Sequence, residues 1–371
     1  MTTFDVQLWD DGSARRVSHE AGRFVRVEPI AARAGLSLLA PGLFDLQVNG
    51  ALGRGFTNAV LTVEDVATIS ETMAIHGVTG YLPTVITSST ETILAALTTL
   101  HNAVEQDAEL RAMIPGFHLE GPFLNPADGP RGAHPRVFIR DAKWDTFRRF
   151  QDAAGGHIRL VTLAPEVPGA LPLIAKLVEA GIVVSLGHTM ATRAELRNAV
   201  DVGATMSTHL GNGIAATLPR HDNPIWPQLA DDRLTAAVIA DGDHLPADVL
   251  QCIARIKGPE RLVLTSDAAG LAGLPPGRYR EWGQELEITD TGRIVLAGTP
   301  YLAGSGRFLD DCFQRFRNTT GWNLRQTIIA ASITPRRLLR LPLPVLAAGK
   351  PTRAWMLVDE DDITLLHKPK A

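Results

Sequence analysis

Apolar runs of strand length recur along the chain from Pro41 onward, and a stretch with helical spacing follows most of them. We count eight such strands, at 42–48, 78–85, 114–120, 158–164, 182–188, 204–210, 235–241 and 261–267. Helices are predicted between them, at 63–76, 90–105, 141–154 and 168–180. Thr192 and Glu195 have the spacing of a capping box and mark the start of a further helix.

Eight strand–helix units in succession indicate one closed sheet. Continuous apolar strands need cover on both faces, and closure removes the exposed edges. We therefore predict an α/β fold, a TIM (β/α)8 barrel over residues 41–344, in which two more helices near 305–318 and 323–332 follow the eighth strand.

The two ends of the chain differ from this pattern. The first forty residues contain short patterned stretches, FDVQLW and RFVRVE, with a turn at Asp10-Asp11-Gly12. The tail TRAWMLVDEDDITLLH returns to strand-like sequence. We expect residues 1–40 and 345–371 to form one small discontinuous β-sandwich domain.

Composition argues against several classes of function. A chain of 371 residues with 45% hydrophobic content can bury a large core. Its 36 basic and 40 acidic residues are scattered, so no nucleic-acid partner is expected. The two cysteines, Cys252 and Cys312, suggest neither a disulfide framework nor a thiolate metal site, which fits a cytoplasmic protein. The start lacks a secretory pattern and no apolar run approaches membrane-spanning length, so no membrane association is expected.

Polar side chains stand at the carboxyl ends of the predicted strands. They are Gln47 and Asn49 on the first strand, Glu120 on the third, His188 and His209 on the fifth and sixth, His244 after the seventh and Asp267 on the eighth. Because these strand ends meet at one rim of a TIM barrel, the side chains are expected to converge. Glu120, His188 and His209 make up the His₂Glu set that binds zinc or a similar divalent ion and leaves one position open. The sequence therefore predicts a hydrolytic metal site.

Each of these residues also has a structural interpretation. A strand-end histidine is often a hydrogen-bonded structural residue, Glu120 is a candidate turn cap, and Asp267 is a candidate helix cap. Their occurrence together at one rim favours the metal site. His118 lies two residues before Glu120 on the same strand face, one layer deeper, and is expected to pack inside the barrel rather than to bind metal.

The motifs around these residues are similar to those of a known family. They are PGLFDLQVNG, HLEGPFLN followed by RGAHP, SLGHT, STHLGN, IADGDH, SDAAG and LAGSG. With them, the chain resembles the N-acetylglucosamine-6-phosphate deacetylase family of the amidohydrolase superfamily over nearly its full length. The resemblance implies a TIM barrel, a small β domain built from both chain ends, and removal of the acetyl group from an amino-sugar phosphate.

The resemblance also implies roles for individual residues. It makes Glu120, His188 and His209 the ligands of one divalent metal ion per subunit, with Zn²⁺ as the first expectation and Fe²⁺ as the second. It makes Asp267 the catalytic acid and base.

Substrate contacts are implied in the same way. His134 and His244 are expected to line the substrate pocket, and Asn212, Gly213 and Arg220 to recognise the phosphate. The family makes part of its phosphate contact from the neighbouring subunit, so the resemblance also implies a homodimer.

Two stretches depart from related sequences. Many amidohydrolases hold a second metal with a His-x-His pair where this chain has Gln47-x-Asn49, and amides are poor ligands for transition metals, so one metal is expected. These amides are expected either to bond the substrate or a water on the metal, or to satisfy strand-end backbone groups. The altered loop 214–228 leaves two alternative substrates open. One is another N-acyl amino sugar, including an unphosphorylated one, and the other is a cyclic amide. A catalytically silent scaffold is the third alternative.

Overall fold

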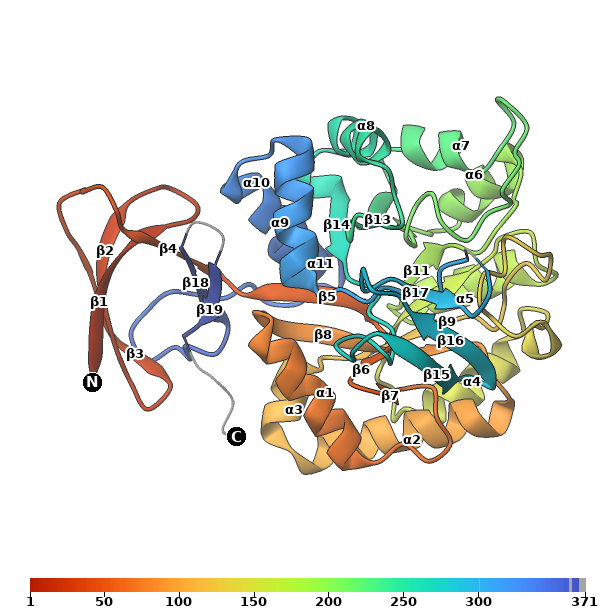
Figure 1. Ribbon diagram of the computed structural model, residues 1–371, viewed down its shortest axis with the longest axis horizontal. Helices are drawn as coiled ribbons and strands as arrows, with labels where there is room; N and C mark the ends of the chain where they lie inside the picture. The colour runs from red at the N-terminus through yellow and green to blue at the C-terminus, as the bar shows by residue number, and fades with distance from the viewer. Residues whose placement is uncertain (300, 360–361, 367–371) are drawn as a thin grey trace.

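The computed structural model describes residues 1–299, 301–359 and 362–366. It shows a barrel surrounded by helices, with a smaller sheet domain beside it that holds the N-terminus (Figure 1).

Eight parallel strands follow the order of the chain around the barrel. They are β5 (Leu43–Val48), β8 (Val78–Ile86), β9 (Phe117–Glu120), β10 (Ile158–Leu163), β11 (Val183–Leu186), β12 (Met206–Ser207), β13 (Thr235–Ile239) and β14 (Leu262–Thr265). The segment after β14 joins β5, because Asp267 N–H donates to Gln47 O at 3.0 Å and Val48 bridges Ala268. The eight predicted strands and the TIM barrel are confirmed.

The barrel strands are buried on both faces, as their continuous apolar sequences predict; every residue of β5 and of β14 is buried. Side chains from successive strands meet in an interior cluster, whose buried members include Phe44, Leu46, Leu82, Leu160, Met206, Ala237 and Val263. The barrel is therefore a packed core, and chemistry is confined to its rim.

Helices cover the outside of the barrel (Figure 1). They are α1 (Val63–Ile75), α2 (Thr90–Gln106), α3 (Ala108–Met113), α4 (Trp144–Ala153), α5 (Ala170–Glu179), α6 (Arg193–Asp201), α7 (Ile225–Ala230), α8 (Ala247–Lys257), α9 (Leu309–Thr320), α10 (Leu324–Ile328) and α11 (Thr334–Leu338), with short 3-10 turns η1 (Arg136–Phe138) and η2 (Pro259–Arg261) and a π-helical turn η3 (Ile329–Ile333). The predicted capping box begins α6: Thr192 Oγ1 accepts from Glu195 N–H at 3.3 Å, and the Glu195 carboxylate accepts from Thr192 N–H at 2.8 Å.

Both chain ends contribute to a second sheet of six strands. In chain order these are β1 (Thr2–Leu8), β2 (Ala14–Glu20), β3 (Arg23–Pro29), β4 (Ser37–Pro41), β18 (Trp355–Asp359) and β19 (Asp362–Leu365). A small domain built from both ends is therefore confirmed, and its strands form one sheet with its own apolar core. Its boundaries at 40 and 345 stay predictions, and residues 360–361 and 367–371 of the predicted span lie outside the described residues.

Two small antiparallel sheets were not predicted by the hydrophobic pattern. They are β15 (Gly277–Glu281), β16 (Gln284–Ile288) and β17 (Ile294–Leu296), and the pair β6 (Gly50–Ala51) and β7 (Arg54–Gly55). β15 and β16 carry charged residues between apolar ones, so they lack the continuous apolar runs of the barrel strands. Gln284 Nε2 donates to Ala133 O at 3.3 Å, which places this hairpin beside the loop after β9. Within the described ranges, no helix is long and apolar enough to cross a membrane.

Candidate metal centre

Three ligand-type atoms meet at the carboxyl ends of β9, β11 and β12. Glu120 Oε1 lies 3.2 Å from His188 Nε2 and 3.1 Å from His209 Nε2, and the two nitrogens are 3.1 Å apart. Ligands held at ~2.0–2.1 Å from a tetrahedral ion are roughly 3.3 Å from one another. The triangle therefore has the size of three ligands on one divalent ion.

The protein fixes the proton on one of these imidazoles. His188 Nδ1 lies 2.8 Å from Pro130 O, and because a carbonyl only accepts, Nδ1 carries a proton; in the neutral ring Nε2 then keeps its lone pair. Gly213 leaves room for both rings, because a Cβ at this residue would lie 2.9 Å from His188 Nδ1 and 3.2 Å from His209 Cε1. His209 Nδ1 is buried and has no hydrogen-bond partner in the part of the chain that the structure describes.

Charge also favours a cation in the triangle. Burial acts to raise the pKa of Glu120, but the contacts with His188 and His209 outweigh it and hold this pKa well below its ordinary value. Glu120 is therefore anionic.

Two histidines compete for the third ligand position. The ligand atoms of Glu120, His188 and His134 lie within 4.8 Å of one another, but His134 Nε2 is 3.8 Å from the other oxygen, Glu120 Oε2. With its shorter contacts, His209 fits the third ligand position better than His134 does.

The backbone adopts an uncommon conformation at three of these rim positions. His188, His209 and Asp267 have φ angles of 52°, 29° and 52°, in the left-handed region that non-glycine residues rarely adopt. Such a conformation costs on the order of 1–3 kcal/mol and persists where the surrounding fold enforces it. At these three residues, the left-handed conformation occurs where the chain leaves a barrel strand.

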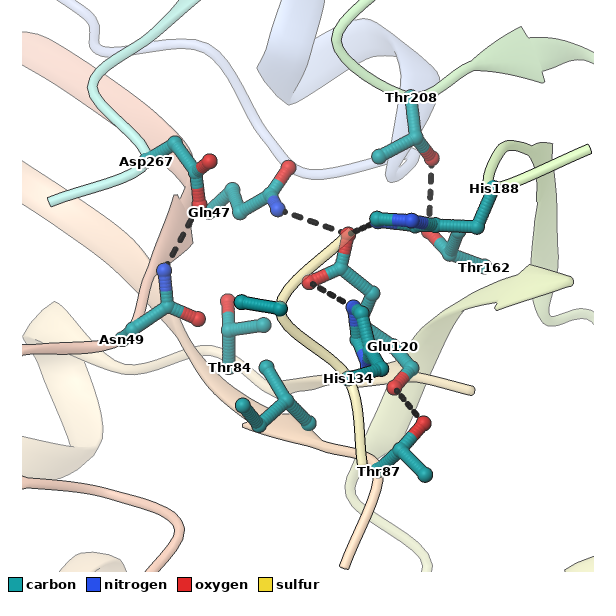
Figure 2. A network of polar contacts seen from close by, with 12 residues as sticks. Gln47, Asn49, Thr84, Thr87, Glu120, His134, Thr162, His188, Thr208 and Asp267 are labelled. Atoms are coloured by element: carbon teal, nitrogen blue, oxygen red, sulfur yellow. Dashed lines mark hydrogen bonds and ion pairs between the residues drawn. The ribbon is translucent and has the colours of Figure 1, made fainter. Parts of the chain in front are cut away.

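The amides of Gln47 and Asn49 each hold one carboxylate (Figure 2). Gln47 Nε2 donates to Glu120 Oε1 at 3.0 Å, and Asn49 Nδ2 donates to Asp267 Oδ1 at 2.7 Å. Burial and then the negative charge of Glu120 raise the pKa of Asp267. Asp267 therefore takes up a proton more readily than an ordinary aspartate, as a general acid and base must.

His134 reaches the site from the loop after β9 and lies beside Glu120 (Figure 2). Burial lowers the pKa of His134 to about 3, so its imidazole is neutral, and its Nδ1 is buried without a partner among the described residues.

His118, unlike His134, has a hydrogen-bond partner at each ring nitrogen. Its Nδ1 lies 3.2 Å from Leu46 O and its Nε2 2.8 Å from Thr162 Oγ1, so both nitrogens are engaged within the barrel, in agreement with the expectation that it packs there.

Asp241, at the end of β13, was not predicted as a site residue. Its Oδ2 accepts from His244 Nδ1 at 2.7 Å and from Ser305 Oγ at 2.9 Å, and its Oδ1 accepts from His244 N–H at 2.9 Å. Burial acts to raise the pKa of Asp241, and the contacts with His244 lower it far below its ordinary value. Asp241 therefore holds the proton of His244 on Nδ1 and leaves Nε2 available. The Asp-x-x-His spacing in IADGDH is the sequence signal for this pair.

The residues expected to bind phosphate are only partly brought together. Asn212 Nδ2 donates to His209 O at 3.2 Å, and Gly213 lies against the histidine rings. Arg220 is exposed on the loop before α7, where its backbone oxygen accepts from Trp226 Nε1 at 3.2 Å. Within the described ranges the Arg220 guanidinium has no hydrogen bond or ion pair, so it is available to a ligand or to another subunit.

A buried carboxylate stands at the turn of the β15–β16 hairpin. Glu281 Oε2 is buried and makes no hydrogen bond to any described residue, and burial raises the pKa of Glu281 to about 7. Its Oε1 lies against Gly55 and Gly270, where a Cβ would collide with it. The carboxyl group is therefore enclosed between the β6–β7 pair and the segment after Asp267.

Comparison with known proteins gives consistent results, although no protein-family model matches the chain. The chain is 38% identical over 315 residues to the N-acetylglucosamine-6-phosphate deacetylase of Bos taurus, a match that covers 82% of this chain and 75% of that protein. It is 32% identical over 361 residues to the N-acetylgalactosamine-6-phosphate deacetylase of Escherichia coli O157:H7, covering 95% of this chain and 92% of that protein.

The chain is also similar, over nearly its full length, to enzymes of known structure. The crystal structure of N-acetyl-D-glucosamine-6-phosphate deacetylase from Mycobacterium smegmatis has a TM-score of 0.87 and 31% identity, covering 98% of this chain and 97% of that one. An Asp-to-Ala variant of that enzyme, in complex with N-acetyl-D-glucosamine-6-phosphate, has a TM-score of 0.84 and 32% identity, covering 94% and 91%.

Proposed function

Because this chain belongs to the N-acetylglucosamine-6-phosphate deacetylase family of the amidohydrolase superfamily, we propose that it hydrolyses the N-acetyl amide of N-acetylglucosamine 6-phosphate. The products are glucosamine 6-phosphate and acetate. The observation that carries the proposal is the buried triangle of Glu120, His188 and His209 on the same rim as Asp267.

The triangle would hold one divalent ion, Zn²⁺ in the first place and Fe²⁺ as the alternative. The donor set, two imidazoles and one ionised carboxylate, suits either ion. When bound, such an ion supplies the Lewis acidity that activates water and polarises the amide carbonyl. Gln47 holds the carboxylate of the set by its bond to Glu120, and the bond to Pro130 O keeps a proton on His188 Nδ1, so that Nε2 of the neutral ring would be free to bind the ion.

Asp267 is the proposed catalytic acid and base. It takes a proton from the water whose oxygen bonds to the acetyl carbon, and it gives that proton to the sugar nitrogen as the carbon–nitrogen bond breaks. The raised pKa of Asp267 suits both transfers, because the group has to accept the proton and then release it near neutral pH. Asn49 holds one carboxylate oxygen at 2.7 Å, which keeps the other oriented for the transfer.

Two histidines are proposed to contact the substrate. His134 is neutral and buried beside Glu120, so an N–H of its ring is suited to stabilise the oxyanion that forms on the acetyl group. His244 is held by Asp241, and its free Nε2 is suited to accept a hydrogen bond from a sugar hydroxyl.

Recognition of the 6-phosphate is proposed for Asn212, Gly213 and Arg220. The guanidinium of Arg220 is exposed and unengaged among the described residues, which supports contact with a phosphate, either in its own subunit or across a homodimer. The homodimer itself stays a prediction from the family.

A substrate panel tests the proposal. The enzyme, loaded with Zn²⁺, should hydrolyse N-acetylglucosamine 6-phosphate with a higher kcat/KM than unphosphorylated N-acetylglucosamine. Equal values would favour an unphosphorylated substrate, and no hydrolysis with either Zn²⁺ or Fe²⁺ would favour a silent scaffold. N-acetylgalactosamine 6-phosphate belongs in the panel as the second candidate, because the relative named for that substrate matches 95% of the chain.

A further inference from the structure

A second group of metal-binding side chains lies away from the catalytic rim. His101 and Glu105 are four residues apart on α2, so they lie on one face of that helix, and His157 comes from the segment between α4 and β10. Their ligand atoms lie within 4.8 Å of one another. His157 Nε2 is 3.7 Å from Glu105 Oε1, and the two imidazole ring centroids are 5.6 Å apart.

This group is at the opposite end of the barrel from Glu120. His157 directly precedes the first residue of β10, and its carbonyl accepts from Phe117 N–H, at the start of β9, at 2.8 Å. The catalytic rim lies at the other ends of these strands. The five residue steps from Ile158 to Leu163 along β10, at ~3.3 Å each, separate the two ends by about 16 Å. An ion in one site would therefore share no ligand with an ion in the other.

The surroundings of His157 suit a metal ligand. Burial, and then the neighbouring His101, lower the pKa of His157, which favours the neutral ring that a metal requires. His101 Nδ1 is buried and has no partner among the described residues, so no hydrogen bond at this nitrogen determines which ring nitrogen carries the proton.

The two carboxylate oxygens of Glu105 have different neighbours. Oε2 accepts from Arg111 Nη2 at 3.2 Å, whereas Oε1 faces His157. The Glu105 side chain is 50% exposed, so it has room to move from 3.7 Å to the roughly 3.3 Å expected between two ligands of one ion.

We propose that His101, Glu105 and His157 form a second, surface site for one Zn²⁺ ion. Two imidazoles and a carboxylate select a transition metal over Mg²⁺ or Ca²⁺, which prefer sites made only of oxygen ligands. The bound ion joins the last turns of α2 to the segment that leads into β10. Its effect is on stability, because nothing in the proposed chemistry reaches this end of the barrel.

Metal content at equilibrium tests the site independently of the catalytic reaction. The wild-type enzyme and its variants are dialysed against buffer containing Zn²⁺, and Zn²⁺ per subunit is measured by mass spectrometry. The His157→Gln and Glu105→Gln variants are expected to hold one equivalent less than the wild type. The matched control is His19→Gln, which removes a histidine on β2, outside both sites, and should leave the content unchanged.

Thermal unfolding gives a second measurement. Added Zn²⁺ should raise the Tm of the wild type further than that of His157→Gln, because an ion that binds only the folded state stabilises it. Hydrolysis by this variant should be unchanged. Glu105 is largely exposed, so its substitution leaves folding intact and keeps the test valid if His157→Gln misfolds. Equal Zn²⁺ content in the wild type, Glu105→Gln and His157→Gln would overturn the proposal.

Discussion

Replacing Glu281 with glutamine should make the stability of the protein less sensitive to pH. The folded pKa of Glu281 is about 7 and its ordinary value is 4.5, because burial disfavours the charge. An unfolded chain releases this proton near pH 4.5, whereas the folded chain keeps it until about pH 7, so folding stability falls as pH rises through that window. The difference between 7 and 4.5, at ~1.36 kcal/mol per pH unit, gives about 3 kcal/mol.

Between about pH 5 and about pH 8 the expected change is about 2.5 kcal/mol, since the unfolded glutamate is already partly ionised at the lower pH. Urea unfolding, followed by tryptophan fluorescence, measures the free energy of unfolding of the wild type and Glu281→Gln at both pH values. Comparing the two pH values cancels effects of the substitution that do not depend on pH. Glu285→Gln, on the exposed side of β16, is the matched control. If the difference in free energy of unfolding between the wild type and Glu281→Gln is the same at both pH values, the reasoning is refuted.

Three further predictions concern the catalytic rim. Asp267→Asn should lower kcat at least about a hundredfold and leave the metal content unchanged, and near-normal turnover would contradict its role as acid and base. Arg220→Ala should mainly raise KM for a phosphorylated substrate, and an unchanged KM would place anion recognition elsewhere. Asp241→Asn should lower kcat/KM because Asp241 acts through His244. The double variant with His244→Asn should therefore have the same kcat/KM as His244→Asn alone, and additive losses would show that the two residues act independently.

The barrel was predictable from sequence because its strands are buried on both faces and therefore read as continuous apolar runs. The same pattern also located the candidate metal ligands. Glu120, His188 and His209 lie at or just after the ends of their strands, and in a parallel barrel those ends share one rim. The capping box at Thr192 was predictable because both of its partners lie within one helical turn.

Contacts between distant segments were not predictable in this way. The Ser305–Asp241 bond joins residues 64 positions apart, and the bond that fixes the proton of His188 comes from a backbone carbonyl 58 positions away. The enclosure of Glu281 depends on two glycines in other segments. Such contacts arise from the paths of loops, for which no periodic pattern exists.

The left-handed backbone at His188, His209 and Asp267 has a consequence for protein engineering. Glycine would relieve the strain at each position, with a gain on the order of 1 kcal/mol, but it would also delete a proposed ligand or the proposed acid and base. A search that ranks substitutions by folding energy alone would therefore select changes that remove the active site. Stabilising this scaffold requires that these three positions be held fixed while the rest of the chain is varied.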